Sequence, residues 1–177
     1  RQLEKMMEQV DKQQLEEQLK EMKLGQEDVE KELDRALEMF KRMEVEQKTE
    51  DIAKQLEELA KRQEELSEET KEGETPSEEL QKKQEELNKE FEELRKEMDE
   101  LEKKNEELEE PMELPETDQQ EQEIQDEQKQ SSEQLEKKQN QKAGGAQKSA
   151  AEKMEQLAFQ MQSAMQSNAE EQQEEDM

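Results

Sequence analysis

Residues 76–110 have the sequence PSEELQKKQEELNKEFEELRKEMDELEKKNEELEE. Large apolar side chains recur along this stretch at alternating steps of four and three residues, with Gln84 and Asn105 in two of the positions. The complete series is Leu80, Gln84, Leu87, Phe91, Leu94, Met98, Leu101, Asn105 and Leu108. This spacing is the heptad pattern of a coiled coil, so it predicts a helix with one apolar seam.

The preceding segment, residues 26–71, carries the same pattern with one interruption. A first stripe consists of Val29, Leu33, Ala36, Phe40 and Met43. A second stripe consists of Val45, Thr49, Ile52, Leu56, Leu59, Gln63, Leu66 and Thr70. The heptad slips in phase between the two stripes, which is expected to change the supercoil locally. The pattern predicts a second long helix.

The six residues between the two predicted helices, 72–77, contain the signals of a tight turn. Gly73 suits the left-handed conformation that often ends a helix. Thr75-Pro76-Ser77-Glu78 matches a capping box with proline at the first helical position. Helices joined by so short a turn are expected to be antiparallel neighbours.

One antiparallel register aligns the two seams along their whole length, and this register agrees with the position of the turn. It places Leu66 opposite Leu80 and the polar residues Gln63 and Gln84 opposite each other. The predicted coiled-coil seam consists of Val45, Ile52, Leu56, Leu59, Gln63, Leu66, Leu80, Gln84, Leu87, Phe91, Leu94, Met98 and Leu101. The predicted fold is all-α, an elongated antiparallel coiled-coil hairpin over residues 26–110. A parallel homodimer, a longer bundle and disorder are the alternatives.

Three segments flank the predicted hairpin. Residues 1–24 form an amphipathic pattern, which we interpret as the continuation of a helix from a longer parent protein, with Gly25 as a weak point. Residues 111–148, rich in Gln and containing Pro and Gly, are predicted to be a low-complexity linker. Residues 149–177 are predicted to be a Met- and Gln-rich helix that begins at a second capping box, Ser149-Ala150-Ala151-Glu152. One face of it is a candidate partner surface: Met154, Leu157, Met161 and Met165.

The composition limits both the fold and the function. Only 26% of the 177 residues are hydrophobic and 46% are charged, with a formal net charge of −28. An ordinary globular domain is roughly half apolar, so the apolar residues here are expected to line narrow seams between helices. Nucleic acid would be repelled by this charge, since the chain has no basic patch and few aromatic side chains.

The residues that usually carry chemistry are scarce. The chain has no His and no Cys, which excludes the usual zinc sites and nucleophile–base pairs. Neighbouring carboxylates such as Glu57-Glu58 are expected to be a solvated surface, because acid–base catalysis needs two carboxyl groups in different environments. No apolar run is long enough to span a membrane. We predict no catalytic residue, no cofactor and no metal site, and no direct membrane contact by this segment.

A resemblance to a known family rests mainly on residues 32–48, ELDRALEMFKRMEVEQK. This stretch resembles one in a family of large Bacteroidetes proteins that is catalogued as a domain of unknown function. The later order is also similar: a leucine heptad, a Gln-rich tract and a Met- and Gln-rich helix. The resemblance implies a membrane-anchored bacterial parent of which this chain is an extramembrane helical segment. It implies no catalytic residues.

These observations predict a non-catalytic coiled-coil scaffold, spacer or protein-interaction segment. Its expected partners are proteins, either further helices of the parent or a second copy in a homo-oligomer. The alternative is an acidic, chaperone-like arm that holds basic or unfolded client proteins through its charge and its flexible methionine side chains.

Overall fold

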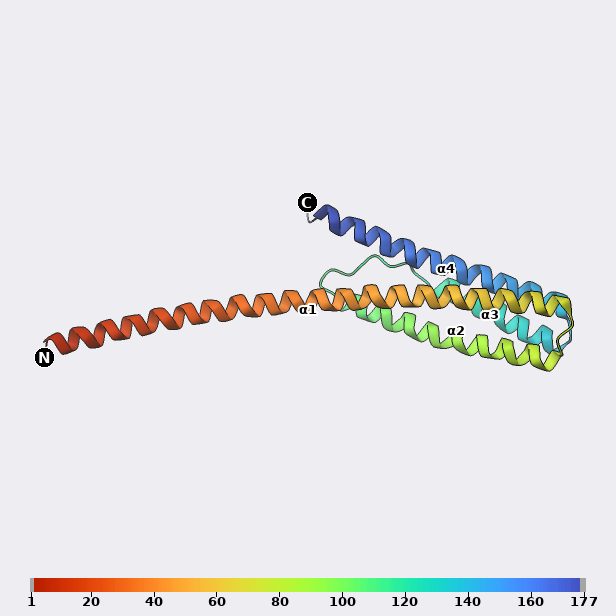
Figure 1. The fold of residues 1–177 in the computed structure, drawn as a ribbon, viewed down its shortest axis with the longest axis horizontal. Helices are drawn as coiled ribbons and strands as arrows, with labels where there is room; N and C mark the ends of the chain where they lie inside the picture. Colours follow the sequence, from red (N-terminus) through yellow and green to blue (C-terminus); the bar gives the residue numbers. More distant parts are fainter. Residues whose placement is uncertain (1, 176–177) are drawn as a thin grey trace. The chain divides into compact units, whose positions relative to one another are not determined.

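The computed structural model describes residues 2–175, with side-chain environments for residues 14–23 and 25–174. Four α-helices occupy most of this range, and no β-strand occurs within it. They are α1 (Gln2–Glu72), α2 (Ser77–Glu106), α3 (Asp118–Glu136) and α4 (Asn140–Glu175) (Figure 1). The prediction of an all-α fold is confirmed.

The chain divides into two compact units, residues 1–41 and residues 42–177. In the first unit, the described residues belong to α1 alone. The second unit contains the rest of α1 together with α2, α3 and α4 (Figure 1). The boundary corrects the predicted hairpin at one end, because residues 26–41 lie outside the unit that contains α2. Gly25 does not interrupt α1.

The second unit is a four-helix bundle in which successive helices run in opposite directions. Hydrogen bonds or ion pairs join every pair of neighbours: Gln63 to Gln84 for α1 and α2, Arg95 to Glu121 for α2 and α3, Lys153 to Glu127 for α3 and α4, and Ser67 to Gly144 for α4 and α1. Helix α4 therefore lies against α1 and closes the bundle. The predicted hairpin of α1 and α2 is one half of it.

The heptad seams of α1 and α2 face the core of this bundle. All thirteen predicted seam residues are buried, from Val45 at the start of the unit to Leu101 in α2. The phase slip marks where the core begins, since Met43 is 57% exposed and Val45 is 1% exposed. The hairpin register is the predicted one, because the amides of Gln63 and Gln84 hydrogen-bond to each other.

The predicted linker over residues 111–148 is wrong in most of its length. It contains all of α3 and the first turns of α4, and only residues 111–117 and 137–139 of it are outside helices. Buried positions in α3 follow the same steps of three and four as the other seams: Glu121, Ile124, Gln128, Ser131 and Leu135. Most of them are polar, so the pattern resembles low-complexity sequence although it has heptad spacing.

The two predicted capping boxes do not form, although the helix end at Gly73 is confirmed. Gly73 adopts a φ of 72°, the left-handed conformation expected after a helix. The Thr75 hydroxyl donates to a carboxylate oxygen of Glu69 over 2.8 Å rather than capping α2. Lys83 Nζ lies 2.7 Å from the same oxygen, and these hydrogen bonds from Lys83 and Thr75 lower the pKa of Glu69.

The second predicted capping box lies inside a helix rather than at its start. Helix α4 begins at Asn140, so Ser149 lies within it, and its hydroxyl donates to Glu127 of α3 over 3.0 Å. Ser149 thus joins two helices rather than starting one.

Small side chains let α1 and α4 pack closely together. The hydroxyl of Ser67 donates to the carbonyl oxygen of Gly144 over 2.6 Å. Two buried pairs share this antiparallel register at heptad intervals, Ala60 with Ala151 and Ala53 with Ala158. A Cβ atom built at Gly144 would lie 3.2 Å from the backbone oxygen of Ser67 and closer still to the Lys71 side chain. Gly144 is therefore a site of close helix contact.

Substitution of the two neighbouring glycines tests this contact. Gly144→Leu is expected to destabilise the bundle by about 1–3 kcal/mol, because the larger side chain forces α1 and α4 apart. Gly145 is exposed with open space around it, so Gly145→Leu is expected to stabilise α4 by about 0.5–1 kcal/mol through helix propensity. Urea unfolding followed by circular dichroism measures both. Equal effects of the two substitutions would contradict the close contact.

Candidate functional site

A layer of buried glutamines crosses the bundle, with one glutamine from each helix: Gln63, Gln84, Gln128 and Gln147. Gln63 and Gln84 exchange hydrogen bonds of 2.9 and 3.0 Å between their side-chain amides. Gln147 donates to the Gln84 oxygen over 3.0 Å, and Gln128 donates to the Gln63 oxygen over 3.4 Å. The layer therefore connects all four helices, including both diagonal pairs.

Hydroxyl and amide groups extend this network outward through α2 and α3. Ser131 donates to the Gln84 oxygen over 3.1 Å, and the Gln84 amide also donates to Asn88 over 2.8 Å. Asn88 in turn donates to Ser132 over 3.0 Å. Every glutamine of the layer has at least one hydrogen bond, and the side-chain oxygen of Gln147 is the one buried layer atom without a partner. The layer contains no titratable group, so its chemistry is hydrogen bonding and not proton transfer.

The glutamine layer predicts a large penalty for Gln84→Ala. The substitution removes the acceptor shared by Gln63, Ser131 and Gln147 and leaves a cavity in the core. The two effects together are expected to cost about 3 kcal/mol.

Urea unfolding measures this cost against Glu85→Ala, a control at an exposed neighbouring position, which is expected to change stability by less than about 0.5 kcal/mol. Similar unfolding midpoints for the two variants would contradict the role of the layer.

Two asparagines hold the connection between α2 and α3 against the bundle. The Asn105 amide donates to the Met112 carbonyl over 2.8 Å and accepts from the Met112 N–H over 2.9 Å. Asn168 of α4 binds both backbone groups of the next residue, Glu113, in the same way, over 2.9 and 3.2 Å. Consecutive residues of an extended segment are thus fixed from two helices. Asn105 continues the heptad series of α2 and is buried there, and its amide binds this connection.

Among the described residues, one carboxylate side chain is buried, that of Glu121 in α3. Arg95 Nε lies 3.1 Å from one of its oxygens, and the Thr117 hydroxyl donates to the other over 2.5 Å. Arg95 also donates to Gln125 over 2.8 Å, which fixes the guanidinium. Both oxygens of Glu121 are therefore engaged, one by Arg95 of α2 and the other by Thr117 at the start of α3 itself. The sequence prediction missed this residue because Glu dominates the composition.

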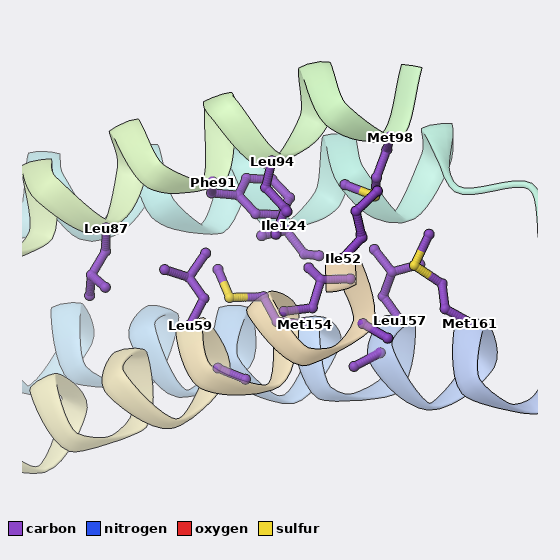
Figure 2. Close-up of a cluster of buried hydrophobic side chains, with 14 of the residues drawn as sticks. Ile52, Leu59, Leu87, Phe91, Leu94, Met98, Ile124, Met154, Leu157 and Met161 are labelled. Atoms are coloured by element: carbon purple, nitrogen blue, oxygen red, sulfur yellow. The ribbon is translucent and has the colours of Figure 1, made fainter. Parts of the chain in front are cut away.

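The predicted partner face of α4 lies inside the bundle, which corrects that prediction. Met154, Leu157 and Met161 are buried, and Met165 is partly buried against the same core. Figure 2 shows the first three turned toward side chains of other helices, among them Ile52. The chaperone-like alternative requires these methionines as a flexible contact surface, but Met154 and Met161 are buried in this bundle and Met165 is partly buried.

The exposed apolar surface lies instead on α1. The large apolar side chains that are exposed on α1 are Leu15, Leu19, Met22, Val29, Leu33, Leu37, Met39, Phe40 and Met43. Most of them follow one heptad stripe, and Phe40 is 75% exposed. Outside α1, one large hydrophobic side chain of the described residues is exposed, that of Phe159 in α4. Exposed apolar side chains concentrated in this way are uncommon on the surface of a soluble monomer.

The charge is distributed unevenly along the chain. Residues 1–41 carry 12 acidic and 8 basic side chains, a formal net charge of −4, so −24 of the total of −28 falls on residues 42–177. Among the described residues, no group of His, Cys, Asp and Glu side chains has the arrangement of a metal site. No helix in residues 2–175 is long and apolar enough to cross a membrane.

Comparison with protein-family models, with curated proteins and with solved structures finds no match to this chain.

Proposed function

We propose that this chain is a non-catalytic helical scaffold with two parts. The four-helix bundle of residues 42–177 acts as a rigid, negatively charged spacer. The part of α1 before the bundle core carries a protein-interaction surface, the apolar stripe of exposed side chains from Leu15 to Met43. The observation that carries the proposal is this stripe, because it leaves large apolar side chains in water where the bundle buries most of its own.

The spacer role is supported by the construction of the bundle. Its part of α1, residues 42–72, spans about 46 Å at 1.5 Å per residue. The glutamine layer fixes the register of the four helices, and the asparagine contacts fix the long connection between α2 and α3. A four-helix bundle whose register and connection are fixed by hydrogen bonds keeps a constant distance between its two ends.

The non-catalytic part of the proposal is supported by the hydrogen bonding of the buried polar groups. The central layer consists of amides and hydroxyls, and the buried Glu121 is engaged through both oxygens. Neither arrangement leaves an acid or base free toward a substrate. The membrane-anchored parent stays a prediction from the resemblance to the Bacteroidetes family.

A photo-crosslinking amino acid tests the interaction surface in cells. Placed at Leu33, within the stripe, it is expected to form protein adducts on irradiation. Placed at Lys31, which lies two residues away and outside the stripe, it is expected to form several-fold fewer. Equal labelling from both positions, or no adduct from Leu33, would contradict an interaction surface on this face.

A further inference from the structure

We propose that the apolar stripe of α1 binds the same stripe of a second copy, with the two helices antiparallel over residues 15–40. This inference rests on the proposed function, since it names the partner of the interaction surface. Four observations support it: the regularity of the stripe, its area, the distribution of charge and the pairing that one register produces.

The stripe has the spacing of a coiled coil without interruption over four heptads. Its positions alternate by four and three residues: Leu15, Leu19, Met22, Gln26, Val29, Leu33, Ala36, Phe40 and Met43. All nine side chains are exposed. A continuous heptad of this kind fits the side chains of a partner helix into its gaps, so the natural partner is another helix of the same spacing.

The exposed apolar surface is large enough for a stable complex. Eight of the nine large exposed side chains retain more than half of their accessible surface, and Leu19 retains 49%. Side chains of this size bury roughly 60–120 Å² each. Eight of the nine lie within residues 15–40, six on the stripe and Leu37 and Met39 beside it, so they provide about 480–960 Å² per copy. This range includes the roughly 800 Å² that each partner contributes to a typical specific interface.

The charge distribution permits self-association through this helix and determines its direction. Residues 1–41 carry a net charge of only −4, whereas the bundle that follows carries −24. In a parallel pair, both bundles would begin at the same end of the coiled coil and repel each other. In an antiparallel pair, they begin at opposite ends of a helix pair about 40 Å long. That distance is several times the screening length of about 8–10 Å in physiological salt.

One antiparallel register pairs the stripe with itself. It places Leu15 opposite Phe40 of the other copy and Leu19 opposite Ala36, so large residues face smaller ones. Met22 then faces Leu33, and Gln26 faces Val29 near the two-fold axis. Beside the seam, Lys23 lies next to Glu30 of the other copy, an attractive pair that occurs twice by symmetry. A register one heptad longer would place Glu30 beside Glu30 instead.

The mass of the intact chain in solution is the first test. A dimer has twice the 21.1 kDa of one chain, and light scattering after size exclusion distinguishes the two. Leu33→Ser with Phe40→Ser is expected to weaken dimerisation by more than about 100-fold, since four apolar side chains leave each interface. Lys31→Ser with Asp34→Ser, outside the stripe and neutral in net charge, is the matched control and is expected to remain dimeric.

Cysteine crosslinking tests the direction and register in the otherwise unchanged chain, which has no cysteine of its own. A mixture of Leu19→Cys and Ala36→Cys chains is expected to form the mixed disulfide dimer in preference to either symmetric dimer. Leu33→Cys is expected not to crosslink to itself, because the register separates the two copies of this position by about 16 Å along the axis.

The outcomes distinguish this inference from the proposed function. A monomeric chain whose Leu33 position crosslinks to a different protein would overturn the second copy as partner and leave the scaffold proposal standing. Self-crosslinking of Leu33→Cys without the mixed 19–36 product would overturn the antiparallel arrangement. A monomer without any adduct at Leu33 would overturn both proposals.

Discussion

The reciprocal hydrogen bonds between the side-chain amides of Gln63 and Gln84 are the interaction on which the bundle depends. A seam of leucines alone would tolerate a shift by one heptad, because leucine meets leucine in either position. A buried amide does not, since a shifted register leaves its donor and acceptor without partners at a cost of about 1–3 kcal/mol each. Gln128 and Gln147 extend the same constraint to α3 and α4.

The remaining packing follows from a shortage of apolar residues. With 26% hydrophobic residues, the chain cannot provide four wide apolar faces. It uses large side chains in α1 and α2, polar ones in much of α3, and small ones where α4 contacts α1. The close approach at Gly144 compensates for small side chains, because helices that lie closer together need less volume to fill the space between them. The asparagine contacts then hold the connection between α2 and α3 at one end of the core, where Met112 and Leu114 add apolar side chains.

The hairpin was predictable from sequence and the other half of the bundle was not, for a physical reason. In α1 and α2, leucine, isoleucine and phenylalanine occupy most of the seam positions, so burial and spacing give the same signal. In α3, the buried positions include Glu121, Gln128 and Ser131, whose burial depends on partners in other helices. The buried positions of α3 have the heptad spacing of three and four residues, but most of them are polar, so the sequence shows no apolar stripe there. The α4 methionines were recognised as one face, yet their partners could not be identified before α3 was known to be a helix.

The central claim is that the glutamine-rich segment of residues 118–136 is a structural helix of the bundle and not a linker. Hydrogen exchange measured by mass spectrometry tests it directly, since exchange is slow only where backbone hydrogen bonds are formed and stably packed. The account predicts that amides around Gln128 exchange about as slowly as those around Gln84 of α2. Exchange around Gln128 at the rate of an unstructured peptide, with α2 still protected, would contradict it.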